Sequence, residues 1–131
     1  MRIAFLILPI LLLGAVSAAA EEAALPPEVA LSKAKLTGGR VEGLEEALEK
    51  TRAAVAHCVA VHGGLTGDSG RLDVQFLVRD RGRAEGVEVM RAQRVTGEAA
   101  TCVQRLLKNR LIGTPSDDPV GVLYAYKFSK R

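Results

Sequence analysis

Residues 71–90, RLDVQFLVRDRGRAEGVEVM, decide the fold class of this chain. In the first half of this stretch apolar residues alternate with polar ones, which predicts a strand with one face in the core and one in water. The apolar set is Leu72, Val74, Phe76 and Val78. Segment 80–83 contains a glycine suited to a tight turn, and the alternation resumes at residues 87–90. The stretch therefore predicts two antiparallel strands joined as a hairpin.

Helical periodicity is present on both sides of this hairpin. In segment 41–61 apolar and small residues recur at steps of three or four, while charged residues fill the opposite face. The recurring set is Leu44, Leu48, Thr51, Val55, Cys58 and His62. A second apolar stripe follows Thr96, a residue type suited to capping a helix. That stripe consists of Ala99, Cys102, Val103, Leu106 and Leu107.

The last alternating segment predicts a third strand. Its apolar face carries Val120, Val122, Tyr124, Tyr126 and Phe128. Helices on one face of a small antiparallel sheet are the economical packing for the order helix, strand, strand, helix, strand. We therefore predict an α+β fold for residues 41–131: a small αββαβ domain with two helices packed on a three-stranded antiparallel sheet.

The first forty residues have a different composition. Met1-Arg2 precedes the apolar run 3–16, and small residues at 17–20 lead to Glu21-Glu22, which is the secretory pattern. The apolar run is shorter than the roughly 20 residues of a spanning helix, so an uncleaved anchor is the less favoured alternative. We predict a signal peptide at 1–20, cleaved after Ala20 or Ala18. The Ala-rich segment 21–40 is expected to be a flexible leader.

The charge pattern bears on the possible partners. Lys and Arg total 18 against 15 acidic residues, a formal net charge of +3, and the two signs are interspersed. Nucleic-acid binders instead gather basic residues on one face. We therefore expect a protein that binds no nucleic acid. The secretory pattern of residues 1–20 adds the expectation of a periplasmic or secreted protein with no membrane span in the mature chain.

Cys58 and Cys102 are the only cysteines, and each lies on the apolar stripe of its own predicted helix. In an exported protein two such cysteines are expected to pair, which would join the helices. The alternative is a pair of buried free thiols that act as small apolar groups. A thiol-redox enzyme more often has a Cys-x-x-Cys motif, which this chain lacks.

Taken together, these motifs resemble a known family. They are Cys58 on a helix, the sequence Gly-Leu-Thr-Gly at 64–67, a strand with a Gly-containing turn, Cys102-Val103 on a second helix, and the final strand. The pattern is similar to the TonB C-terminal-like domains, especially the AgmX/PglI C-terminal type. That resemblance implies an αββαβ unit that binds protein partners in the periplasm and has no catalytic residues. The final strand departs from the family's Tyr-Pro-Phe-x-Phe. An energy transducer needs a retained membrane anchor and a long Pro-rich spacer, and since the sequence predicts neither, we expect a free-standing domain.

Two residues suggest an alternative chemistry. Cys58 and His62 share one face of the first predicted helix at i,i+4, a spacing that zinc sites use. Metal binding through this pair is the alternative to the disulfide, because a bonded cysteine has no thiolate to offer. No nucleophile motif accompanies them, so we expect no enzyme activity, no cofactor and no metal.

The sequence therefore favours a non-catalytic, TonB C-terminal-like module for protein binding or assembly in the cell envelope. We expect binding by pairing along a sheet edge, because an edge strand has unpaired backbone groups. The expected edge is the final strand, with Val120, Val122, Tyr124, Tyr126 and Phe128, or the hairpin's free edge at 87–92. The partner would be another envelope protein or a second copy. The alternative function is a small exported metal-binding protein that uses Cys58 and His62.

Overall fold

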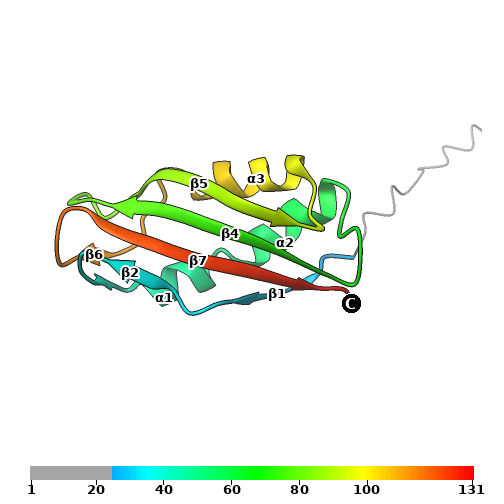
Figure 1. Cartoon of the computed structure of the whole chain (residues 1–131), viewed down its shortest axis with the longest axis horizontal. Helices are drawn as coiled ribbons and strands as arrows, with labels where there is room; N and C mark the ends of the chain where they lie inside the picture. Colours follow the sequence, from blue (N-terminus) through cyan, green and yellow to red (C-terminus); the bar gives the residue numbers. More distant parts are fainter. Residues whose placement is uncertain (1–24) are drawn as a thin grey trace, which may run out of the picture.

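The computed structural model describes residues 25–131, so the predicted signal peptide lies outside the described residues. Ten elements follow one another in these residues (Figure 1). They are β1 (Glu28–Leu31), β2 (Lys35–Thr37), β3 (Val41–Glu42), α1 (Leu44–Glu49), α2 (Arg52–Val61), β4 (Ser69–Val78), β5 (Ala84–Gln93), α3 (Gly97–Leu107), β6 (Thr114–Pro115) and β7 (Val120–Ser129).

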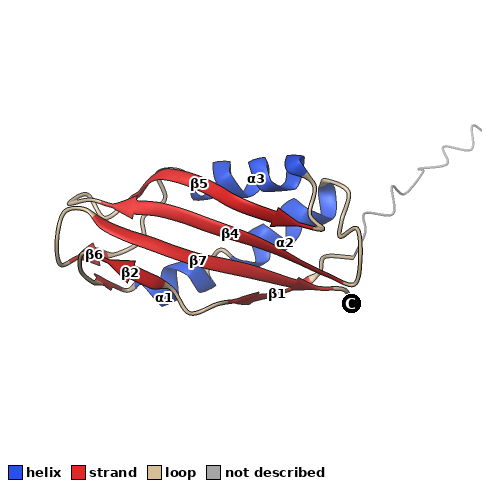
Figure 2. Ribbon diagram, viewed as in Figure 1, coloured by secondary structure: helices blue, strands red, loops and turns tan. Residues whose placement is uncertain are grey.

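The main sheet has five antiparallel strands. Its order is β1-β7-β4-β5, and β2 pairs with β7 on the same side as β1. The helices lie on one face of this sheet (Figure 2). Side chains on that face of β4 are fully buried, whereas Arg71, Asp73 and Gln75 on the other face are partly or fully exposed. We call this second face the open face.

The α+β class and the hairpin are confirmed, because β4 and β5 pair as antiparallel neighbours. The three-strand count is wrong, since β1 and β2 add two strands. Both come from segment 21–40, which we expected to be a flexible leader. Val29 is buried and Leu31 packs against the core, so this part of the segment is held by apolar contacts as well as by strand pairing.

The first predicted helix is divided into α1 and α2. Thr51 lies between them, is fully buried, and donates from Oγ1 to the carbonyl of Leu48 at 2.5 Å. A threonine hydroxyl that bonds a nearby carbonyl competes with the helical hydrogen bonds, which accounts for the break. The second helix is confirmed, and Thr96 Oγ1 accepts from Ala99 N at 3.1 Å as its cap.

Two glycines allow the hairpin turn and the segment after α3 to pack closely. Gly82, with φ of 72°, accepts from Ile112 N at 2.7 Å and from Gly113 N at 3.2 Å. A Cβ on Gly82 would collide with the carbonyl of Gly113, and one on Gly113 would collide with the carbonyl of Glu42. Backbones approach this closely only where no side chain intervenes. Within 25–131, no helix is long and apolar enough to span a bilayer.

Candidate functional site

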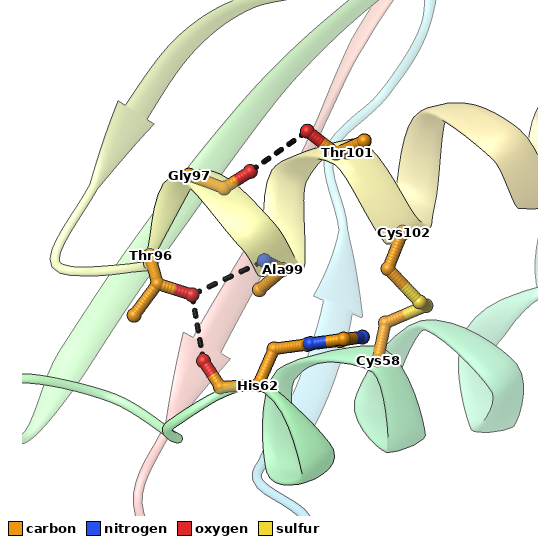
Figure 3. Close-up of a disulfide and its surroundings, with 7 residues drawn as sticks. All are labelled: Cys58, His62, Thr96, Gly97, Ala99, Thr101 and Cys102. Atoms are coloured by element: carbon orange, nitrogen blue, oxygen red, sulfur yellow. Dashed lines mark hydrogen bonds between the residues drawn. A yellow bond between two sulfur atoms is a disulfide. The ribbon is translucent and has the colours of Figure 1, made fainter.

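The two cysteines form a bond between helices. Cys58 in α2 and Cys102 in α3 form a disulfide, with Sγ atoms 2.08 Å apart, as predicted (Figure 3). The sequence separation is 44, so the bond encloses the whole β4–β5 hairpin. Cys58 is buried, while Cys102 is only partly buried. The disulfide therefore holds α2 and α3 together within the helix layer.

His62 is at the junction of these two helices. Its carbonyl accepts from Thr96 Oγ1 at 2.6 Å, and Thr96 also caps α3, so the end of α2 is tied to the start of α3. Its side chain points toward the disulfide (Figure 3). Because Cys58 is bonded, the alternative metal site of Cys58 and His62 loses its thiolate ligand. In the described part of the chain, no group of three His, Cys, Asp or Glu side chains has metal-binding geometry.

The structure contradicts the prediction that β7 is a binding edge. β4 pairs with β7 from Val120 to Ser129, and on the other side β2 pairs with 121–123 and β1 with 126–129. Ser32 fills the gap between β1 and β2, since its Oγ accepts from Ala125 N at 2.8 Å and its N donates to Ala125 O at 2.9 Å. The backbone of β7 is therefore occupied on both sides.

The side chains of the predicted edge belong to the core instead. All five are buried: Val120, Val122, Tyr124, Tyr126 and Phe128. Their alternation marks the buried face of a central strand that packs under the helices. A partner would have to unfold the sheet to reach them.

A buried chain of hydroxyl groups crosses this core. Tyr124 donates to the Tyr126 oxygen at 3.0 Å, and the Tyr126 oxygen is 2.7 Å from Thr51 Oγ1. Because Thr51 donates its only proton to Leu48, Tyr126 is the donor to Thr51. Burial raises the pKa of both phenols above the ordinary value, and the interaction with Tyr126 raises the pKa of Tyr124 further. These groups serve the fold, because every one of them bonds within the core.

The sheet has two true edges. One is formed by β1 and β2, which are four and three residues long and are separated by the Ser32 break. Short, interrupted strands are poor templates for another chain. The other edge is β5, which is ten residues long and pairs with β4 alone in the main sheet. Its outer side is therefore the longest run of strand backbone without a second neighbour among residues 25–131.

Loops occupy both ends of the outer side of β5. Ala84 N donates to Arg110 O at 2.9 Å and Ala84 O accepts from Asn109 N at 2.9 Å, so both Ala84 groups point away from β4. At the other end Arg94 O accepts from Thr66 N at 3.1 Å. Between these two anchors, residues 85–93 form an edge window that no other strand covers.

Two bulges set the pattern inside the edge window. The β4–β5 register shifts between Asp73 and Val74 and again between Gln75 and Leu77, each time by one extra residue in β5. Backbone groups of an antiparallel strand alternate between its two sides. The backbone groups of Ala84 point away from β4, and each bulge adds one residue to the count along β5. We therefore expect the backbone N–H and C=O groups of Val87, Val89 and Ala92 to point away from β4 as well.

No protein-family model, curated protein or solved structure matches this chain. The similarity to TonB C-terminal-like domains stays a prediction from the residues that suggested it. The function is therefore inferred from the geometry of the chain itself.

Proposed function

We propose that this chain is a non-catalytic protein-binding module of the cell envelope, which binds its partner by adding a strand at the edge window of β5. The observation that carries the proposal is the single-sided pairing of β5 over residues 85–93. An extended segment placed there would bond to the free backbone groups, and alternate side chains would set specificity.

The rest of the fold supports this use of β5. The disulfide and the tied ends of α2 and α3 hold the helix layer rigidly, and α3 packs against β5. A rigid edge loses little conformational freedom when a partner strand is added, which favours affinity. The opposite edge offers no comparable run, because β1 and β2 are short and interrupted.

The proposed location is the periplasm or the extracellular space. A disulfide persists in oxidising compartments and is rare in the cytosol. The bond between Cys58 and Cys102 agrees with such a compartment, and so does the secretory pattern of residues 1–20.

Photocrosslinking in cells tests the proposed edge. A photoreactive residue at Met90, 55% exposed in the edge window, is compared with one at Leu123, 39% exposed on central strand β7, and one at Leu36, 37% exposed in β2. All three are apolar strand residues, so a difference in their adducts shows mainly which part of the sheet the partner contacts. We expect a defined adduct from Met90 alone. Adducts only from Leu123 or Leu36 would contradict the proposal.

A backbone variant separates strand addition from ordinary side-chain contact. Ala92 is exposed and its N–H is expected to point away from β4. Ala92→Pro removes that donor, whereas Ala92→Ser keeps it, so the serine variant is the matched control. We expect the proline variant to abolish the Met90 adduct while its thermal unfolding stays close to that of the serine variant. An unchanged adduct in the proline variant would mean that β5 accepts no strand.

A further inference from the structure

The charges of the edge window are arranged so that they complement a second copy of the same strand. We propose that the strand added at β5 is β5 of another molecule of this chain, giving a two-fold symmetric dimer with one continuous sheet. This inference rests on the proposed function, because it names the partner of the same edge.

The two bulges bring the polar side chains of β5 to one face. In the register with β4, Glu88 lies opposite Gln75 and Arg91 lies opposite Asp73, and both β4 residues are on the open face. Glu85 and Gln93 likewise lie opposite Leu77 and Arg71. In a regular strand two residues three positions apart, such as Glu88 and Arg91, face opposite sides, and the bulge at Met90 brings them to the same face.

Glu88 and Arg91 have no ionic partner in the described part of the chain. Both are exposed, and among residues 25–131 neither takes part in a salt bridge. Their nearest charged neighbours across the strand pair are already engaged, since Arg71 Nε contacts Asp73 Oδ1 at 2.6 Å. Arg91 Nη2 donates to the Gln93 side-chain oxygen at 2.6 Å, which is a neutral acceptor. The edge window therefore presents one acidic and one basic side chain without an ionic partner among residues 25–131.

Symmetry fixes which residues would meet. Two antiparallel copies of one strand in one sheet are related by a two-fold axis perpendicular to the sheet, so each residue keeps its face. With Val89 on that axis, Glu88 lies opposite Arg91 of the second copy, and the same pair recurs on the other side of the axis. Directly opposite charges of this kind stabilise a strand pair, and like charges destabilise it.

The remaining positions are compatible with this register. Val89 would pair with its own copy through outward backbone groups, Val87 would lie opposite Ala92, and Glu85 opposite Gln93. Arg94, with φ of 54°, bends the chain at the end of the window, where its carbonyl is bonded to Thr66. The loops at both ends of β5 therefore limit the pairing to the window itself.

Charge reversal tests the dimer in the mature, disulfide-bonded protein. Sedimentation equilibrium is measured for the natural chain, Glu88→Arg, Arg91→Glu and the double variant. In each single variant, positions 88 and 91 of the two copies carry like charges, and this unfavourable pair occurs twice in the dimer. We therefore expect dimer affinity to fall by about tenfold or more. The double variant restores opposite charges in exchanged positions, and we expect it to recover most of the affinity.

A control distinguishes contact charges from net charge. Glu46→Arg changes the net charge as Glu88→Arg does, but Glu46 is an exposed residue of α1 and lies outside the edge window. We expect this variant to dimerise like the natural chain. Circular dichroism of every variant, measured at concentrations where all are monomeric, checks that each is folded.

The outcomes separate the two proposals. Loss in both single variants and recovery in the double variant would support the dimer. A natural chain that is monomeric at all concentrations, or single variants without effect, would overturn it. In that case a different protein crosslinked to Met90 would leave the proposed function standing. No adduct of any kind from Met90 would overturn both.

Discussion

Removing the disulfide should lower stability by an amount that the loop length sets. In Cys58→Ala/Cys102→Ala the chain loses a crosslink between residues separated by 44 positions. The chain-entropy model assigns about 4 kcal/mol to closing a loop of this length. For a domain of this size that corresponds to a melting temperature lower by roughly 15 °C.

Urea unfolding followed by circular dichroism measures the loss directly. The natural chain is measured with and without a strong reductant, and the double variant is measured in the same two conditions. We expect the reductant to bring the natural chain down to the stability of the double variant and to leave the double variant unchanged. The shared final value shows that the loss comes from the bond rather than from the alanine side chains.

Two results would refute this reasoning. A loss of less than about 1 kcal/mol would mean that the unfolded chain gains little freedom without the bond, contrary to the entropy model. Two cysteines that react with an alkylating agent in the native exported protein would mean that the bond does not form. The second result would also make Cys58 available again as a metal ligand beside His62.

Three further perturbations test the core and the sheet. Burial raises the pKa of both tyrosines, so stability should be unaffected below the unfolded-state value of about 10 and should fall as pH rises beyond it; phenolate absorbance that appears before the circular dichroism changes would contradict this. Gly113→Ala places a Cβ against the β3 backbone and should cost about 3 kcal/mol in urea unfolding, whereas Gly97→Ala, whose Cβ would meet open space, should cost nothing. Ser32→Ala leaves the Ala125 N–H without its acceptor and should cost about 1 kcal/mol, with faster hydrogen exchange at that amide; an unchanged exchange rate would argue against the Ser32 bond.

Hydrophobic periodicity predicted the helices and strands in which buried apolar residues recur at regular intervals along the sequence. The β4–β5 hairpin, the α3 cap at Thr96 and the buried face of β7 each follow from alternating or helical patterns of apolar residues. The pairing of Cys58 with Cys102 followed from their apolar stripes and from the expected export. These features depend on neighbouring residues or on a single pair, which is why one sequence is enough to predict them.

The features that were missed depend on contacts between distant segments. β1 and β2 have only four and three residues, so their alternation is too short to stand out, and they are held by pairing with β7. Once they are present, the final strand changes from an edge to a central strand, which is why the predicted binding edge was wrong. The break at Thr51 is a different case, because it follows from a local side-chain bond to the Leu48 carbonyl that the helical periodicity does not reveal.

The bulges of β5 were the other unpredicted feature, and the proposed dimer depends on them. The sequence alternation at 87–90 suggests a regular strand, whereas the structure contains an extra residue at Met90. That residue brings Glu88 and Arg91 to the same face. Gly86, with φ of 61°, lies at the other bulge, between Glu85 and Glu88, and a glycine is a local sign of that irregularity.

Residue-resolved hydrogen exchange along β5 tests the central claim most directly. The mature, disulfide-bonded protein is measured alone at high dilution and again with the partner identified from Met90 crosslinking, whether that partner is a second copy or another protein. Strand addition predicts slower exchange at the amides of Val87, Val89 and Ala92 in the complex, while the amides of β1 keep their rates. Unchanged exchange at these three amides, with new protection elsewhere on the molecule, would contradict binding at the edge window.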